Sequence, residues 1–200
     1  MSPANLRRRS THEMRILGHS FDEYAEIVRR FHGNEAPGVI IGGIMVDLAV
    51  RSLPDNILYD AVCETNTCLP DAVQILTPCT IGNGWLKIAY TGRFAMTLYD
   101  KQSGEGVRVF LDAKKVEAWP EIKAWYFKLK PKKEQDREKL NREIQKAGDS
   151  ILTVQHVRVR PQITEKKRKG NIAVCPECGE AYPADDGETC PACRGNMLYL

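Results

Sequence analysis

The segment WLKIAYTGRFAMTLYDKQSGEGVRVFLD, residues 85–112, decides the fold class of this 200-residue chain. It contains three runs rich in β-branched and aromatic residues, WLKIAYT, RFAMTLYD and GVRVFLD, and such runs are typical of strands. Thr91-Gly92 separates the first two runs and KQSGEG the last two, and both connections suit β-hairpins. We therefore expect a meander of three strands.

Helical segments precede this meander. In FDEYAEIVRRF, residues 21–31, apolar side chains recur at helical spacing, and Ser20 with Glu23 predicts a capping box at its start. A second helix is expected from about Val39 to Ser52, and its small residues would allow close backbone approach. A strand-like run and a short helix follow. Helices and strands are thus grouped rather than alternating, which predicts an α+β fold.

A polar segment follows the meander. Residues from about 119 to 148 are predicted to be helical, and their second half carries only Leu140 and Ile144 as large apolar residues. A helix of this kind suits a solvent-exposed connector. The alternating run ILTVQHVRV then predicts one more strand. We expect the main domain to cover residues 13–160, a charged linker residues 161–170, and a cysteine-rich module residues 171–200.

Composition narrows the class of protein. The chain is 42% hydrophobic and 28% charged, which suits a soluble globular protein with one sizeable core. A formal net charge of +3 is too small to argue for nucleic-acid binding without a focused basic patch. No apolar run approaches the roughly 18 residues of a membrane helix, and no export signal is present. We expect a cytoplasmic protein whose seven cysteines stay reduced.

The sequence VCPECGEAYPADDGETCPACRGN, residues 174–196, carries two Cys-x-x-Cys pairs. Four thiolates at this spacing form the closed tetrahedral site typical of structural zinc. We predict a zinc ribbon in which an eleven-residue hairpin separates the pairs. Iron bound as in rubredoxin and a pair of disulfides are the alternatives. The predicted ligands are Cys175, Cys178, Cys190 and Cys193.

Three further polar clusters fall where helices or strands are expected to end. They are HGNEAPG at residues 32–38, TNTC at residues 65–68 and PCTIGNG at residues 78–84. Loops carry function more often than cores do, so a pocket is expected where the clusters meet. His32, Cys68 and Cys79 are the candidate catalytic residues. The candidate ligand-binding residues are His32, Asn34, Cys68, Cys79 and Thr80, and His19 could fold back onto them.

Structural roles would also explain several of these residues. A lone cysteine is usually a small buried hydrophobe, which is the interpretation we favour for Cys63 and an equal alternative for Cys68 and Cys79. His32 ends a helix, where a cation is favourable for the helix dipole. His156 lies in an alternating strand and is interpreted as structural.

In this order, the motifs FHGNEAPG, NTC, PCTIGNG, YTGRFAMTLYD and SGEGVRV resemble those of the FmdE-like proteins, a family named after a component of formylmethanofuran dehydrogenase. The resemblance covers roughly residues 15–112. It implies helices packed on a mixed, largely antiparallel sheet, often in a homodimer, and many members carry a C-terminal zinc ribbon. It also implies an association with a molybdenum or tungsten oxidoreductase or its cofactor machinery.

The chain departs from the family pattern FHGHxCPG at two positions. The second histidine is replaced by Asn34 and the cysteine by Ala36. Asparagine and alanine cannot replace the donors that histidine and cysteine offer a transition metal. A second metal in the main-domain pocket is therefore doubtful.

The leading functional hypothesis is a metal-binding accessory protein of molybdenum- or tungsten-linked one-carbon metabolism. The first alternative is an enzyme with Cys68 or Cys79 as nucleophile and a histidine as base. The second is a nucleic-acid binder that uses the ribbon, against which the acidic Asp185 and Asp186 argue. The sequence leaves open whether the protein is an enzyme.

Overall fold

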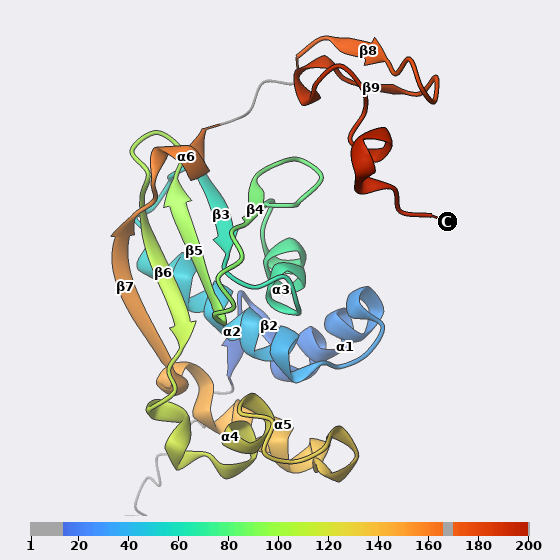
Figure 1. Cartoon of the computed structure of the whole chain (residues 1–200). Helices are drawn as coiled ribbons and strands as arrows, with labels where there is room; N and C mark the ends of the chain where they lie inside the picture. Colours follow the sequence, from blue (N-terminus) through green and yellow to red (C-terminus); the bar gives the residue numbers. More distant parts are fainter. Residues whose placement is uncertain (1–13, 166–169, 200) are drawn as a thin grey trace, which may run out of the picture. The chain divides into compact units, whose positions relative to one another are not determined.

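The computed structural model describes residues 14–165 and 170–199 (Figure 1). The chain divides into two compact units, one ending at Thr164 and the other beginning at Glu165, and each is described by itself. The basic start of the chain with His12, and the Lys-Lys-Arg-Lys run of the expected linker, lie outside the described residues. Within the described residues, no helix is both long and apolar enough to cross a bilayer.

The first unit is built on a five-stranded sheet with the strand order β4-β3-β5-β6-β7. Neighbouring strands are antiparallel except β3 and β4, which are parallel. This mixed, largely antiparallel sheet, with helices packed against it, confirms the predicted α+β class (Figure 1). The strands are β3 (Tyr59–Cys63), β4 (Leu86–Ile88), β5 (Ala95–Asp100), β6 (Glu105–Leu111) and β7 (Leu152–Arg158).

The predicted three-strand meander is wrong in its first strand. β4 pairs with β3, with Ala61 opposite Leu86, and does not pair with β5. Parallel neighbours need a crossover connection, and α3 (Leu69–Leu76) supplies it. The buried side chains of α3 pack on the long helix α2, so the crossover is part of the core.

Two helices at the start of the unit agree with the prediction. A short hairpin of β1 (Arg15–Ile16) and β2 (His19–Ser20) leads into α1 (Phe21–His32), and α2 (Pro37–Ser52) follows. The capping box is confirmed: the Glu23 amide donates to Ser20 Oγ at 3.3 Å, and the Ser20 amide donates to Glu23 Oε2 at 2.7 Å. Gly33, with φ of 84°, ends α1 in the left-handed conformation that glycine adopts without cost.

The glycines of α2 face other helices of the same chain. A Cβ at Gly42 would lie 2.7 Å from Ala72 of α3, and one at Gly43 would lie 2.3 Å from the ring of Tyr24 in α1. The predicted close approach is therefore confirmed, with intrachain partners. The glycine-rich face is covered, so it gives no support to the expected homodimer.

Residues 115–151 differ from the predicted continuous helix. Pro131, whose ring clashes with the preceding helical turn, lies in the break. The segment is not an exposed connector, because Ile122, Leu140 and Ile144 are buried in the main core. Its elements are η1 (Lys115–Ala118), α4 (Pro120–Tyr126), η2 (Lys132–Glu134), α5 (Arg137–Ala147) and η3 (Gly148–Ile151), and α6 (Pro161–Thr164) follows β7.

The second unit is a small hairpin with two following turns. β8 (Ile172–Val174) pairs antiparallel with β9 (Ala181–Pro183), and η4 (Ala184–Asp186) and η5 (Ala192–Asn196) follow. The hairpin therefore encloses the first Cys-x-x-Cys pair, and does not lie between the two pairs as the sequence suggested. The second pair lies at the start of the last turn.

Candidate functional site

The four C-terminal cysteines converge. Their Sγ atoms all lie within 4.8 Å of one another, and those of Cys178 and Cys190 are 3.8 Å apart. A tetrahedral zinc with Zn–S bonds of about 2.3 Å requires sulfur–sulfur separations of about 3.8 Å. The donor set therefore fits a closed four-thiolate metal centre. It is the single group of this kind found among residues 14–165 and 170–199.

Backbone amides around this centre favour thiolates. The Cys190 amide donates to Cys175 Sγ at 3.5 Å. This bond and the amide of Cys178 lower the pKa of Cys175 to about 6. Gly179, with φ of 77°, follows the first pair and allows the tight turn that aims amides at the sulfurs. Only Cys175, Tyr182 and Cys190 are buried in the described part of this unit, so its folding depends on a bound metal.

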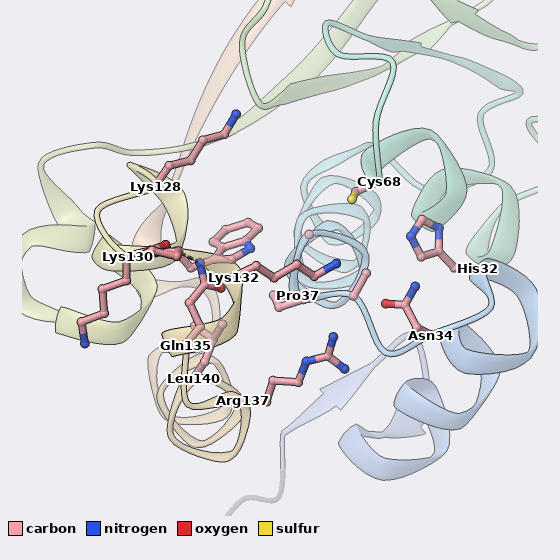
Figure 2. Close-up of a pocket in the computed structure, with 14 residues that line it drawn as sticks. His32, Asn34, Pro37, Cys68, Lys128, Lys130, Lys132, Gln135, Arg137 and Leu140 are labelled. Atoms are coloured by element: carbon pink, nitrogen blue, oxygen red, sulfur yellow. Dashed lines mark hydrogen bonds between the residues drawn. The ribbon is translucent and has the colours of Figure 1, made fainter.

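The first unit contains a cavity of about 630 Å³ (Figure 2). The ends of α1, the start of α2, the start of α3 and the connection between α4 and α5 form its walls. The structure thus brings the first two polar clusters together. The lining residues are His32, Asn34, Ala36, Pro37, Gly38, Cys68, Trp125, Lys128, Lys130, Pro131, Lys132, Gln135, Arg137 and Leu140.

His32 is oriented by a carboxylate that the sequence analysis did not single out. Its Nδ1 lies 2.6 Å from Oδ2 of Asp71, in the first turn of α3. When Nδ1 carries the proton and donates it to Asp71, Nε2 is left as the ring nitrogen able to accept a hydrogen bond or bind a ligand. His32 therefore serves as more than a helix cap.

Cys68 occupies a strained position at the start of α3. Its φ is 56° and its ψ is −58°, a conformation that non-glycine residues rarely adopt. A Cβ at Gly38 would lie 2.8 Å from Cys68 Cβ, so only glycine lets the two helices approach this closely. Burial raises the pKa of the Cys68 thiol and Asp71 raises it further, against the opposing effect of Lys132. The thiol is therefore protonated at neutral pH and is not an activated nucleophile.

Cys79 and Thr80 do not line the cavity. Cys79 is fully buried and its thiol donates to the Tyr59 carbonyl at 3.6 Å. Thr80 closes a turn with Asn83: each backbone amide donates to the other's side chain at 3.1 Å. The parallel pairing explains the separation, because the third cluster leads into the start of β4, next to the start of β3, whereas Cys68 follows the end of β3.

The other candidate residues also lie away from the cavity. His19 belongs to β2 and is not a lining residue. Cys63 is fully buried in the core, as predicted, and burial raises its pKa to about 12. His156 is exposed on β7.

Five lining residues were missed from the sequence because they lie in the supposed connector. Pro131 was the available signal, since it interrupts the helix and so predicts a loop at this point. The missed residues are Trp125, Lys128, Lys130, Lys132 and Arg137.

An α+β unit with a polar cavity, followed by a four-cysteine finger, defines a two-part ligand- and metal-binding protein. Residues 31–159 match the family described as "FmdE, Molybdenum formylmethanofuran dehydrogenase operon", and residues 166–200 match "FmdE treble clef zinc finger". The chain belongs to the FmdE family. Its second unit is a zinc finger of the treble-clef type.

Two relatives support this assignment. A crystal structure of an FmdE-like protein of tungsten formylmethanofuran dehydrogenase, from Syntrophus aciditrophicus, is 56% identical, with a TM-score of 0.88, over 94% of this chain and 99% of that one. A probable S-adenosyl-L-methionine-binding protein of Archaeoglobus fulgidus is 30% identical over 86% of this chain. The chain spans about half the length of that curated relative, 52%.

Proposed function

We propose that this protein is a cytoplasmic accessory protein of a molybdenum or tungsten oxidoreductase of the formylmethanofuran dehydrogenase type. Membership of the FmdE family supports the association. The cavity carries the binding role, because His32, Asn34, Ala36 and Cys68, which occupy motif positions of the family, all line it. A structural zinc on the four cysteines and a homodimer complete the proposal.

Co-purification tests the association. The tagged chain would be expressed in its native host, and the eluate would be analysed for molybdenum and tungsten by elemental analysis and for large subunits by mass spectrometry. We expect an oxidoreductase subunit and its metal to be retained. A variant with His32→Ala serves as the matched comparison for the cavity. An eluate that contains this chain alone would contradict the proposal. Light scattering on the purified chain tests the homodimer, which a single-chain mass at all micromolar concentrations would exclude.

The replaced motif residues allow a test of the cavity itself. Asn34→His with Ala36→Cys would add two donors beside His32 and Cys68, which brings the donor count to the four that zinc prefers. We expect metal content in the full chain to rise from one to two ions after identical loading with zinc. Ala36→Ser, which restores no soft donor, is the control. Unchanged metal content would show that these positions do not converge closely enough to bind a metal.

A cysteine-dependent enzyme is the second candidate, and the His32–Asp71 pair favours it. The two hypotheses differ in the state of the Cys68 thiol. For a binding protein, the iodoacetamide alkylation rate of Cys68, followed by peptide mass spectrometry, should rise only above pH 9, since burial raises the pKa of this thiol. The buried Cys63 is an internal control in the same digest. Rapid alkylation of Cys68 at pH 7 would favour the enzyme.

A further inference from the structure

The cavity in the first unit has a strongly positive lining. Four cationic side chains contribute to it, Lys128, Lys130, Lys132 and Arg137, and of its described lining residues none is acidic. Lys130 is 3.5 Å from Glu121, whereas the other three form no ion pair with any residue that the structure describes. The cavity therefore holds an excess of positive charge that the described residues do not neutralise.

Two of these cations point into the cavity. Figure 2 shows Lys132 and Arg137 extending toward Pro37 and the side that holds His32 and Asn34, whereas Lys128 and Lys130 point away. The start of α2 lies at the same place, and its N-cap residue Ala36 provides no side-chain cap. The partial positive charge of the uncapped helix start adds to that of the two side chains. An arginine fork and a lysine together suit the oxygens of one dianionic group.

The remaining wall is apolar. Trp125, Pro37 and Leu140 line it, and the ring of Trp125 is fixed edge-on by Phe94 at a centroid distance of 6.3 Å. A cavity of about 630 Å³ falls in the size range of organic-ligand sites and far exceeds a single tetrahedral anion. The lining thus combines a place for a dianion with an apolar surface for a larger group attached to it.

We propose that this cavity binds an organic phosphate monoester, with the phosphate between Lys132 and Arg137 and the organic group against Trp125. The inference does not depend on the link to an oxidoreductase, because it follows from the charge and shape of the cavity alone. It also explains why a segment with two inward cations packs over the replaced positions Asn34 and Ala36.

Isothermal titration with phenyl phosphate tests the proposal on the full chain. We expect Lys132→Gln with Arg137→Gln to weaken binding at least tenfold, since each removes a charge-assisted hydrogen bond. Lys133→Gln is the matched control, because Lys133 is the exposed neighbour of Lys132 and does not line the cavity. The control should bind within twofold of the wild type. Circular dichroism would establish that all variants are folded.

Three results would overturn the proposal. One is wild-type affinity for phenyl phosphate in the double variant. Another is an equal loss in Lys133→Gln, which would indicate nonspecific attraction to the basic surface. The third is binding of inorganic phosphate or tungstate as tightly as phenyl phosphate, which would mean that the site takes a free oxyanion and that Trp125 contributes nothing. Weaker binding of both inorganic anions, together with a loss of affinity in Trp125→Ala, would support the organic ester.

Discussion

At the scale of single residues, the contact between Gly43 and Tyr24 sets how closely α1 and α2 approach. Tyr24 is fully buried, and its hydroxyl donates to the Val39 carbonyl at 3.1 Å. The ring therefore cannot swing aside when an atom is added opposite it. The same hydroxyl fixes the ring against the helix that leads into the cavity.

We expect Gly43→Ala to lower the free energy of unfolding by about 1–3 kcal/mol. Alanine is the better helix former by about 1 kcal/mol, but its Cβ would lie 2.3 Å from the Tyr24 ring, so the clash dominates. Urea unfolding measures the change. Gly82→Ala, at a position with nothing within 4 Å, is the control and should change little. Equal stability of the two variants would contradict this account.

Glu64 is a buried acid at the end of β3 that two arginines neutralise. Arg108 Nε lies 2.6 Å from its Oε1, Arg93 Nε lies 2.7 Å from its Oε2, and the Thr91 hydroxyl donates at 3.0 Å. Burial alone would raise the pKa of Glu64, but the bonds from Arg108 and Thr91 and the nearby charges lower it below its ordinary value of 4.5. The charged form is therefore favoured in the folded protein.

This lowered pKa predicts a dependence of stability on pH. The ionised Glu64 contributes its full stabilisation above pH 4.5, and the contribution is lost as the pH falls through the lower pKa of the folded state. We expect Glu64→Gln to cost about 1–2 kcal/mol at pH 7, a figure reduced by the solvent exposure of Arg93, and less at pH 3. Urea midpoints at both pH values measure this. A cost that does not shrink in acid would assign Glu64 a purely steric role.

At the scale of elements, local signals predicted some features well and pairing poorly. The capping box at Ser20 and the helical spacing of apolar residues located α1, because both signals lie within a few residues of one another. The parallel pairing of β4 was missed, because adjacency along the chain favours a hairpin and nothing local encodes a crossover. For the same reason Cys79 was wrongly grouped with Cys68.

The second missed element is α5. With Leu140 and Ile144 as its two large apolar residues, its composition resembles that of an exposed helix, yet spacing of four residues puts both on one face. That narrow face is buried in the core. The cavity cations were overlooked with it, since a run of lysines in an exposed helix has no evident partner.

Ile144→Ala tests the placement of α5. Ile144 is fully buried, so we expect a loss of about 2–4 kcal/mol in the free energy of unfolding. Gln145→Ala, one residue along on the exposed face, should stay within about 0.5 kcal/mol of the wild type. An exposed connector would instead tolerate both changes equally.

At the scale of the whole molecule, the two units should respond independently to loss of metal. We expect one zinc per chain in the purified protein and none in Cys175→Ser, because three thiolates do not close the site. The first unit should remain folded in that variant, since its core includes none of the four cysteines. Elemental analysis and circular dichroism measure the two outcomes. Retention of zinc, or loss of all secondary structure, would contradict this division.

The strand order also has a consequence for synthesis on the ribosome. Residues 101–104 alone connect β5 to β6, so this hairpin closes a short loop and forms quickly. β3 emerges earlier but must wait for both neighbours, of which β5 ends only at Asp100. Until then its apolar residues and backbone groups stay unpaired on the nascent chain. This inner strand of the finished sheet is therefore the segment most in need of protection by a chaperone during translation.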